Sequence, residues 1–423
     1  KEMAPMEKSL DRKLAAIHAN PSSREFILAD AKDADMAFGI GAPGLSPEAH
    51  AGEVRFKTLA EYRDQIRAIS KQGVVDIMLM SASTNYALTF EERLFDESHV
   101  TPAIRANDTT DVHIARGSHY AEHPSHPFRS ASLDHAMCGH LDCRADERHV
   151  GANLGLYSVT FNNDFAHDLA TLEAFHVFRE EAERKGFRYF LEVFDPNVPG
   201  VIGPETLGPY INDMIARMLA GVAPSGRPLF LKMVYHGPRA MEELFRYDPH
   251  LVIGILGGSA GTTLDAFQLL ADAQKHGARV ALFGRKINSA ENQLAFVQFL
   301  RLIVDGVIGP VEAVKAYHAV LGKLGIKPHR PLDDDLKLQA MNMSYGGTST
   351  SVTVPAKASS NGHACACHAP AKEKAHACKC HDGPKAKSSK NGFPTLSNGH
   401  PDFARMDVAQ RLAYHRERLG LGR

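Results

Sequence analysis

Residues 188–195 read Arg-Tyr-Phe-Leu-Glu-Val-Phe-Asp, and residues 229–236 read Leu-Phe-Leu-Lys-Met-Val-Tyr-His. Each stretch is a short, mostly apolar run that one charged residue interrupts, Glu192 in the first and Lys232 in the second. Runs of this length and composition are typical of parallel strands that are buried on both faces. The two stretches therefore indicate a parallel sheet, and they place an acid and a base inside it.

Similar runs recur from Phe26 to Gly284 and alternate with amphipathic helical stretches. The predicted strands are Phe26–Ala29, Val74–Met80, Thr101–Ile104, Gly155–Phe161, Arg188–Val193, Leu229–Val234, Leu251–Leu256 and Ala278–Phe283. The predicted helices include Leu59–Lys71, Phe165–Lys185, Leu207–Leu219, Ala240–Tyr247 and Thr263–His276. This alternation fits an α/β fold of the closed (β/α)8 TIM-barrel type. A doubly wound open sheet would give the same alternation, but no Gly-x-Gly-x-x-Gly follows the first strand.

Two regions depart from the repeat. The segment from Asp111 to Ala152 follows the third strand, is rich in histidine and is too long for an ordinary loop. After Tyr345 the composition changes to Ser, Thr, Ala, Lys, Gly and Pro, which is typical of disorder. We therefore predict a barrel over 1–344, a disordered linker over 345–392 and a short helical segment over 393–423, with a helix from the N-cap Asp402 to Leu419.

The overall composition is that of an ordinary globular protein, with 44% hydrophobic and 23% charged residues. A formal net charge of -1 favours neither nucleic acid nor an anionic membrane, and no apolar run is long enough for a membrane span. We expect a small-molecule partner instead. The first residues lack the apolar core of a secretory signal, and cysteine is absent from 151–345, which together favour a cytoplasmic location.

The active site of a barrel lies at the C-terminal ends of its strands. Lys232 is the most informative residue there, because a lysine is rarely placed inside a core without a partner. Burial favours its neutral amine, which can attack a carbonyl, and Glu192 could move the protons that such a reaction requires. The alternative is a buried Lys232–Glu192 ion pair that only holds the barrel together.

Other strand ends supply further candidate residues. Asp30 follows the first run and could orient a substrate hydroxyl, or else cap the turn after it. Two glycine loops predict a phosphate site, because glycine lets backbone N–H groups approach an anion. The predicted phosphate-binding residues are Gly257, Gly258 and Ser259 after the seventh strand, Gly284 and Arg285 after the eighth, and Arg105 after the third.

These residues resemble the class I aldolase superfamily, and within it the tagatose-bisphosphate and archaeal-type fructose-bisphosphate aldolases. The resemblance spans roughly residues 26–306 and rests on Leu-Ala-Asp30, Phe-Leu-Glu192-Val, Leu-Lys232, and Gly-Gly-Ser followed by Leu-Phe-Gly284-Arg285. It implies that Lys232 forms an imine with a phosphorylated ketose, that Glu192 moves protons and that the glycine loops hold phosphate. We expect a homo-oligomer that needs no cofactor for catalysis. The alternatives are a transaldolase or phosphosugar isomerase on the same fold, or a non-catalytic barrel that carries a metal-binding tail.

The C-terminal part repeats a Cys/His pattern, His-Ala-Cys-Ala-Cys-His at 363–368 and His-Ala-Cys-Lys-Cys-His at 376–381. Thiols and imidazoles bind soft or borderline metals, so adventitious zinc or copper is predicted at Cys365, Cys367, His368, Cys378, Cys380 and His381. The Cys-x-Cys spacing specifies no structural zinc module, and a plain tether is the alternative.

Two further segments could take part in interactions. The amphipathic helix predicted near the C-terminus would bind another subunit, a protein shell or a multienzyme complex, or would dock on its own barrel. In the histidine-rich segment, Cys138-Gly-His140-Leu-Asp-Cys143 is interpreted as a set of exposed lid residues.

Overall fold

In the computed structural model, the chain divides into two units, residues 1–352 and 353–423. The structure describes residues 6–20, 22–44, 56–113, 115, 117–258 and 261–339 of the first unit. Of the second unit it describes Pro394, 405–407, Ala409, Gln410 and Ala413. The linker predicted over 345–392 therefore lies outside the described residues.

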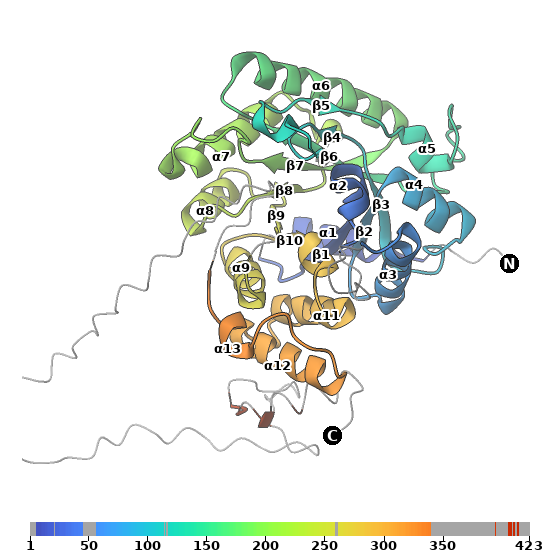
Figure 1. Cartoon of the computed structure of the whole chain (residues 1–423). Helices are drawn as coiled ribbons and strands as arrows, with labels where there is room; N and C mark the ends of the chain where they lie inside the picture. The colour runs from blue at the N-terminus through green and yellow to red at the C-terminus, as the bar shows by residue number, and fades with distance from the viewer. Residues whose placement is uncertain are drawn as a thin grey trace, which may run out of the picture. The chain divides into compact units, whose positions relative to one another are not determined.

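A closed barrel of parallel strands forms the centre of the first unit, with helices packed around it (Figure 1). In barrel order the strands are β1 (Ile27–Lys32), β10 (Val280–Phe283), β9 (Gly254–Leu256), β8 (Leu231–Met233), β7 (Arg188–Phe194), β6 (Leu154–Thr160), β3 (Thr101–Arg105) and β2 (Ile77–Met80). Each of the eight predicted runs supplies one of these strands. The TIM-barrel prediction is therefore confirmed.

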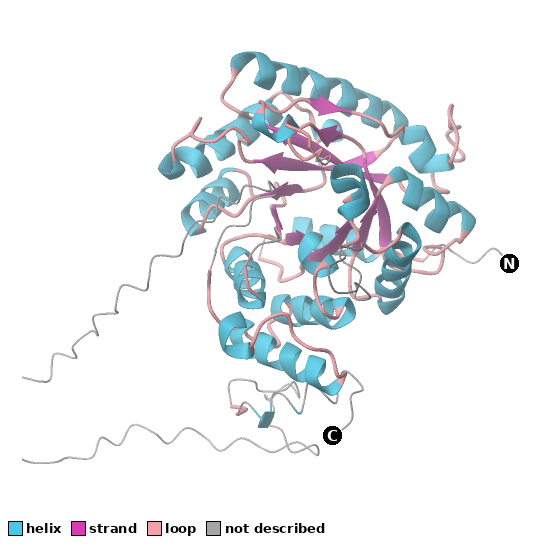
Figure 2. Cartoon of the chain, viewed as in Figure 1, coloured by secondary structure: helices cyan, strands magenta, loops and turns pink. Residues whose placement is uncertain are grey.

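Helices follow the strands and cover the outside of the barrel (Figure 2). They are α1 (Ser9–Ala19), α2 (Asp35–Phe38), α3 (Leu59–Gln72), α4 (Ala82–Asn85), α5 (Leu133–Cys138), α6 (Phe165–Lys185), α7 (Pro204–Ala220), α8 (Pro238–Tyr247), α9 (Thr263–Lys275), α10 (Arg285–Asn288), α11 (Gln293–Val304), α12 (Pro310–Lys323) and α13 (Leu332–Asp335). Their ends follow from capping residues. Thr58 and Glu61 form a capping box before α3, and Gly186 ends α6 in the left-handed conformation, with φ of 66°.

The inside of the barrel is filled by apolar side chains from alternate strand positions. One buried cluster joins Ile27, Ala29 and Ala31 of β1 to inward-facing residues of the other strands. Phe190 and Phe230 stack within this cluster, with ring centroids 4.5 Å apart. Apolar residues of α1 belong to the same cluster, so this helix closes the N-terminal end of the barrel. The barrel is thus a packed core at this end, and the site must lie at the other.

Strand register decides which polar residues face the inside of the barrel. Arg105 pairs with the core residue Leu156. The next inward-facing position of β6 after Leu156 is Ser158. Ser158 pairs with Glu192 of β7, and Glu192 pairs with Lys232 of β8. Because neighbouring residues of parallel strands point to the same face, these four polar side chains line the C-terminal end of the interior.

The segment from Asp111 to Ala152 runs beside the barrel. An antiparallel pair, β4 (Asp108–Thr109) and β5 (Pro127–Phe128), frames its first half, and α5 lies in its second half. In the second unit Ala409, Gln410 and Ala413 are helical, and the Asp407 carboxylate accepts a hydrogen bond from the Gln410 N–H at 2.8 Å. Asp407 is therefore a capping residue, whereas the predicted cap Asp402 lies outside the described residues. Among the described helices, none has the length and apolar composition needed to cross a membrane.

Candidate active site

Lys232 and Glu192 form a buried ion pair at the C-terminal end of the barrel interior. The Lys232 Nζ lies 2.5 Å from Glu192 Oε1, and the side chains are 3% and 0% exposed. Both residues stand two positions after an aromatic residue of the core cluster, Phe230 just before β8 and Phe190 in β7. The sequence prediction that these two side chains face each other is therefore confirmed.

A connected polar network continues from Glu192 across the barrel. Its second carboxylate oxygen accepts a hydrogen bond from Ser158 Oγ at 2.7 Å and lies 3.4 Å from Arg105 Nη2. Arg105 is fully buried and also reaches Asp33, with Nε 2.5 Å from the carboxylate. Asn107 fixes the strand carrying Ser158 through two hydrogen bonds to its backbone. Acid and base thus alternate from Asp33 through Arg105 and Glu192 to Lys232, so each buried charge has an opposite neighbour.

Asp30 lies on the other face of the barrel wall. Ala29 and Ala31 face the interior, so the alternation of the strand points Asp30 and Lys32 outward toward the helices. Lys32 Nζ lies 3.1 Å from Asp30 and donates hydrogen bonds to Asn288 and to Gln293 of α11. Asp30 is also inside β1 and does not cap a helix. The capping alternative is therefore wrong, and the predicted contact with substrate is not supported by this placement.

Burial dominates the electrostatics of this outer pair. Desolvation raises the pKa of Asp30 to about 6, although the Lys32 ammonium opposes the shift. The same desolvation lowers the pKa of Lys32, and Asp30 opposes it. Burial in the apolar wall thus disfavours the charged form of both groups, as expected for a structural pair within a barrel.

A small cavity of about 20 Å³ is lined in part by Lys232. Its lining is formed by Ala31, Asp33, Ala34, Lys232, Leu256, Gly257, Gly258, Leu282, Gly284 and Arg285. The two predicted glycine loops and the predicted lysine therefore share one cavity. A volume of this size holds about one water molecule, so a sugar phosphate could enter only after lining side chains move. Ser259, the remaining member of the first loop, lies outside the described residues.

Packing alone already demands glycine at several of these positions. A Cβ on Gly257 would lie 2.0 Å from the Phe283 ring, and one on Gly284 would lie 2.7 Å from the Ala31 carbonyl oxygen. Gly258 has a φ of 53°, which other residues rarely adopt. The glycines therefore bring the backbone close to the cavity, but their presence is not independent evidence for phosphate. Arg285 stacks over the Phe38 ring at 5.1 Å and is the cation beside these loops that lines the cavity.

Three polar groups at this end of the barrel had no role assigned to them from the sequence. Asp33 lines the cavity, and Ser158 connects Arg105 to Glu192. His236, just after β8, binds Asp195 after β7, with Nε2 2.8 Å from the carboxylate. Their position at the ends of predicted strands was a usable signal, because that is where barrel enzymes carry their functional groups. The direction of each side chain was not readable from the sequence.

A second cavity of about 360 Å³ lies on the other side of the same loops. Lys286 lines it and donates a hydrogen bond to the Gly261 carbonyl at 2.9 Å. Burial lowers the pKa of Lys286 to about 8, and the nearby Arg330 cation acts in the same direction. Consecutive cations, Arg285 and Lys286, thus line different cavities. The predicted metal ligands Cys365, Cys367, His368, Cys378, Cys380 and His381 lie outside the described residues.

Comparison with known proteins identifies the fold. No protein-family model matches the sequence, and no curated protein sequence matches it. A fructose-bisphosphate aldolase from Slackia heliotrinireducens aligns over 76% of this chain and 94% of its own, at 13% identity and a TM-score of 0.51. This chain has the fold of a fructose-bisphosphate aldolase.

An archaeal fructose 1,6-bisphosphate aldolase aligns over 70% of this chain and 99% of its own, at 14% identity and a TM-score of 0.49. The alignment with the Slackia heliotrinireducens aldolase confirms the resemblance stated from the sequence at the level of the fold. At these identities the comparison says nothing about which side chains react, so the chemistry has to be argued from the residues themselves.

Proposed function

We propose that this protein is a class I aldolase that cleaves or forms a C–C bond in a phosphorylated ketose through an imine on Lys232. The observation that carries the proposal is the Lys232–Glu192 contact of 2.5 Å beside a cavity that also reaches both glycine loops and Arg285. A structural ion pair would need no cavity at the amine. A strand lysine that opens onto a cavity at the C-terminal end of a barrel has the position of a nucleophile.

Glu192 lies where the proton transfers of imine formation require a carboxylate. As the ketose carbonyl approaches, Glu192 takes a proton from the Lys232 ammonium, and the neutral amine adds to the carbonyl carbon. The same proton then passes to the carbinolamine hydroxyl, which leaves as water and gives the iminium ion. One carboxylate thus accepts a proton and returns it, and the donor–acceptor distance is already within hydrogen-bonding range.

Cleavage of the C–C bond then requires removal of a proton from the substrate hydroxyl at the far carbon of that bond. The bonding electrons flow to the iminium and form an enamine, and the far carbon leaves as an aldehyde. Asp33 lines the same cavity as Lys232, and its carboxylate lies 2.5 Å from Arg105 Nε. We assign to Asp33 the roles of orienting this hydroxyl, which the sequence had suggested for Asp30, and of accepting its proton. Arg105 acts as a positioning residue between the two carboxylates.

Phosphate binding would supply the affinity that carries the substrate to the amine. The backbone of the glycine loops borders the cavity closely, and Arg285 adds a forked cation that matches phosphate oxygens. Displacing Arg285 from its stack over Phe38 would enlarge the cavity. The arrangement supports a ketose that bears phosphate at the end held by these loops, and a reaction centre close to Lys232.

Borohydride trapping tests the proposal directly. The protein is incubated with a panel of ketose phosphates, reduced, digested and analysed by mass spectrometry. We expect substrate mass on the peptide that carries Lys232, with Lys32 and Lys286 unlabelled as internal controls. The variant K232A should remain folded and lose trapping and turnover, although removing one partner of the buried pair should lower the free energy of unfolding by about 3 kcal/mol. Labelling elsewhere, or none with any ketose phosphate, would return Lys232 to a structural role. Aldehyde release that stops at one equivalent per chain until an acceptor aldehyde is added would favour the transaldolase alternative.

A further inference from the structure

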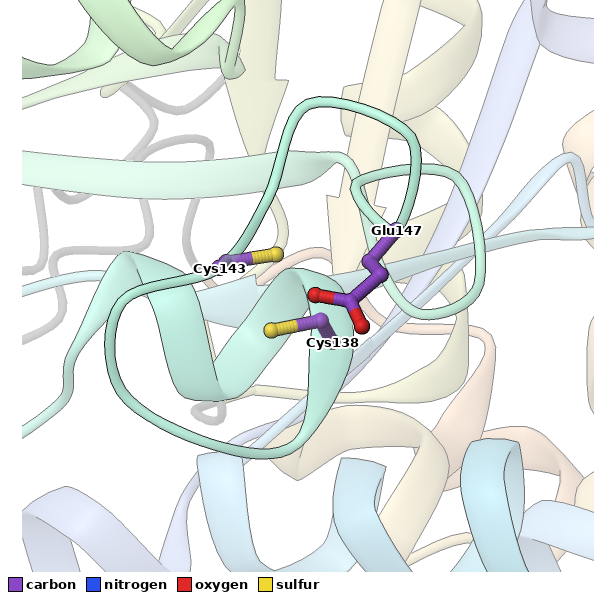
Figure 3. Close-up of side chains that lie close together, drawn as sticks. All are labelled: Cys138, Cys143 and Glu147. Carbon is purple, nitrogen blue, oxygen red and sulfur yellow. The ribbon is translucent and has the colours of Figure 1, made fainter.

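The loop after α5 brings two thiols and a carboxylate together, away from the barrel interior. Cys138 is the last residue of α5, and Cys143 and Glu147 follow in the loop. One ligand atom from each of the three lies within 4.8 Å of the others. Figure 3 shows both sulfur atoms and the carboxylate gathered within the same loop. A tetrahedral zinc site holds such atoms about 3.5 to 4 Å apart. We infer that this loop binds a zinc ion through Cys138, Cys143 and Glu147.

His140 is placed to complete the ligand set. Its Nε2 lies 3.5 Å from Glu147 Oε2, and its Nδ1 lies 2.8 Å from the Leu141 carbonyl oxygen. Zinc-binding histidines commonly donate one ring N–H to a carbonyl, which leaves the other nitrogen free to bind the metal. The imidazole thus has the orienting contact of a ligand, and a small side-chain rotation would bring Nε2 to the ion.

The donor types and spacing favour zinc over other common divalent ions. Two thiolates with an imidazole and a carboxylate form the mixed set that tetrahedral zinc prefers, whereas calcium and magnesium take oxygen ligands. Four residues separate Cys138 from Cys143, within the range usual for structural zinc ligands. Arg144 Nη2 lies 2.9 Å from Glu147 Oε1 and offsets the negative charge that the ligands would retain.

The surroundings indicate a structural role. The loop is closed at its base, because the N–H groups of Gly151 and Ala152 donate to the carbonyls of Met137 and Ala136 at 2.8 and 2.9 Å. Asp134 of α5 binds Lys185, the last residue of α6, at 2.6 Å. Since β7 begins just after α6, this contact places α5 near the N-terminal end of the strands. The zinc would therefore close the loop far from Lys232.

This placement also corrects the lid interpretation made from the sequence. His140 and Leu141 are exposed as expected, but Cys143 is buried, with 7% of its surface exposed, and the loop does not lie at the catalytic end. A disulfide between Cys138 and Cys143 is the competing outcome, because the same proximity would allow it under oxidising conditions. In the structure both are free thiols.

The test must separate this loop from the cysteines near the C-terminus. Full-length chain in which Cys365, Cys367, Cys378 and Cys380 are replaced by serine provides the background. The proteins compared are the background chain itself, the double variant C138S/C143S in this background, and H149A in this background. H149A is a loop control that leaves the proposed ligands intact. Zinc content is measured after exhaustive dialysis, and cobalt replaces zinc for absorption spectroscopy. Alkylation of each cysteine is followed by mass spectrometry of the unaltered protein with and without zinc.

We expect the background chain and H149A to retain one zinc per chain. The double variant should bind zinc more than about 100-fold less tightly, because losing two ligands costs more affinity than losing a residue that only hydrogen-bonds to a ligand. Cobalt should give a tetrahedral spectrum with thiolate charge transfer, and zinc should protect Cys138 and Cys143 from alkylation. Equal zinc in the double variant, unprotected thiols, or a Cys138–Cys143 disulfide in freshly isolated protein would overturn the inference. If the double variant fails to fold, alkylation of the unaltered chain still tests whether zinc protects Cys138 and Cys143. Imine trapping at Lys232 is independent of every outcome.

Discussion

Glu192 stands directly beside Lys232 in the β7–β8 register, and its two carboxylate oxygens serve different partners. Oε1 lies 2.5 Å from the lysine amine, whereas Oε2 accepts from Ser158 and lies 3.4 Å from Arg105. The second set of contacts fixes the carboxylate while the first leaves one oxygen aimed at the amine. A group that is held on one side and shares a proton on the other suits repeated proton transfer, because its position does not change with its charge.

The first prediction concerns E192Q. The amide keeps the shape of the side chain but cannot accept and return a proton, so kcat should fall by about 10²- to 10⁴-fold while KM changes little. Removing one partner of a buried ion pair should also destabilise the fold by about 3 kcal/mol. Steady-state kinetics and the rate of borohydride trapping measure the effect. In the matched control S158A the carboxylate remains, and kcat should fall less than about tenfold. Full activity in E192Q would leave only the structural role.

The second prediction compares adjacent cations. R285A should raise KM by about 10- to 100-fold with kcat nearly unchanged, because a charged hydrogen bond to phosphate contributes about 1.5 to 3 kcal/mol and is remote from the reacting bond. Lys286 points to Gly261 and lines the other cavity, so K286M should leave KM close to that of the unaltered enzyme. Kinetics with a ketose phosphate and with its unphosphorylated analogue give the measurement. An equal rise in KM for both substrates in R285A would contradict phosphate binding at this loop.

Much of this architecture could be predicted from the sequence, because parallel strands that are buried on both faces have nearly continuous apolar sequences. The partnership of Glu192 and Lys232 was predictable for the same reason, since each is an ionisable side chain with apolar residues on both sides in its run. The role of β1 was not. Whether Asp30 or Asp33 reaches the interior depends on a one-residue alternation, and alanines at 29 and 31 give no sign that they are the inward residues.

The meeting of Cys138, Cys143 and Glu147 was likewise beyond the sequence. Their spacing resembles a metal site only if the loop after α5 folds back on itself, and backbone contacts at 136–152 produce that fold. The histidine-rich segment could therefore be recognised from its composition, but neither its role nor the end of the barrel at which it lies could be predicted.

The third prediction follows from the different faces of the two aspartates. D33N removes a carboxylate that lines the cavity and binds Arg105, so kcat/KM should fall by about 100-fold or more. D30N changes a residue behind the barrel wall and should alter kcat/KM less than about threefold in folded protein. Kinetics on both variants, normalised to trapped Lys232, make the comparison. The reverse order of effects would restore the role predicted from the sequence for Asp30.

The last prediction uses the raised pKa of Asp30. Because burial raises the pKa of Asp30 to about 6, the folded state retains this proton at pH values where the unfolded chain, with an ordinary pKa of 3.8, has released it. Between these values the folded state binds more protons, so the contribution of Asp30 to stability falls as pH rises. Asparagine does not titrate. The unfolding free energy of the unaltered protein relative to D30N should therefore decrease by about 2 kcal/mol from pH 4 to pH 6 and become level above about pH 7. Urea unfolding of both proteins at several pH values provides the measurement, and the difference between them cancels the titration of all other groups. A difference that grows with pH would mean that the attraction between ionised Asp30 and Lys32 stabilises the barrel and outweighs the cost of burying the two charges.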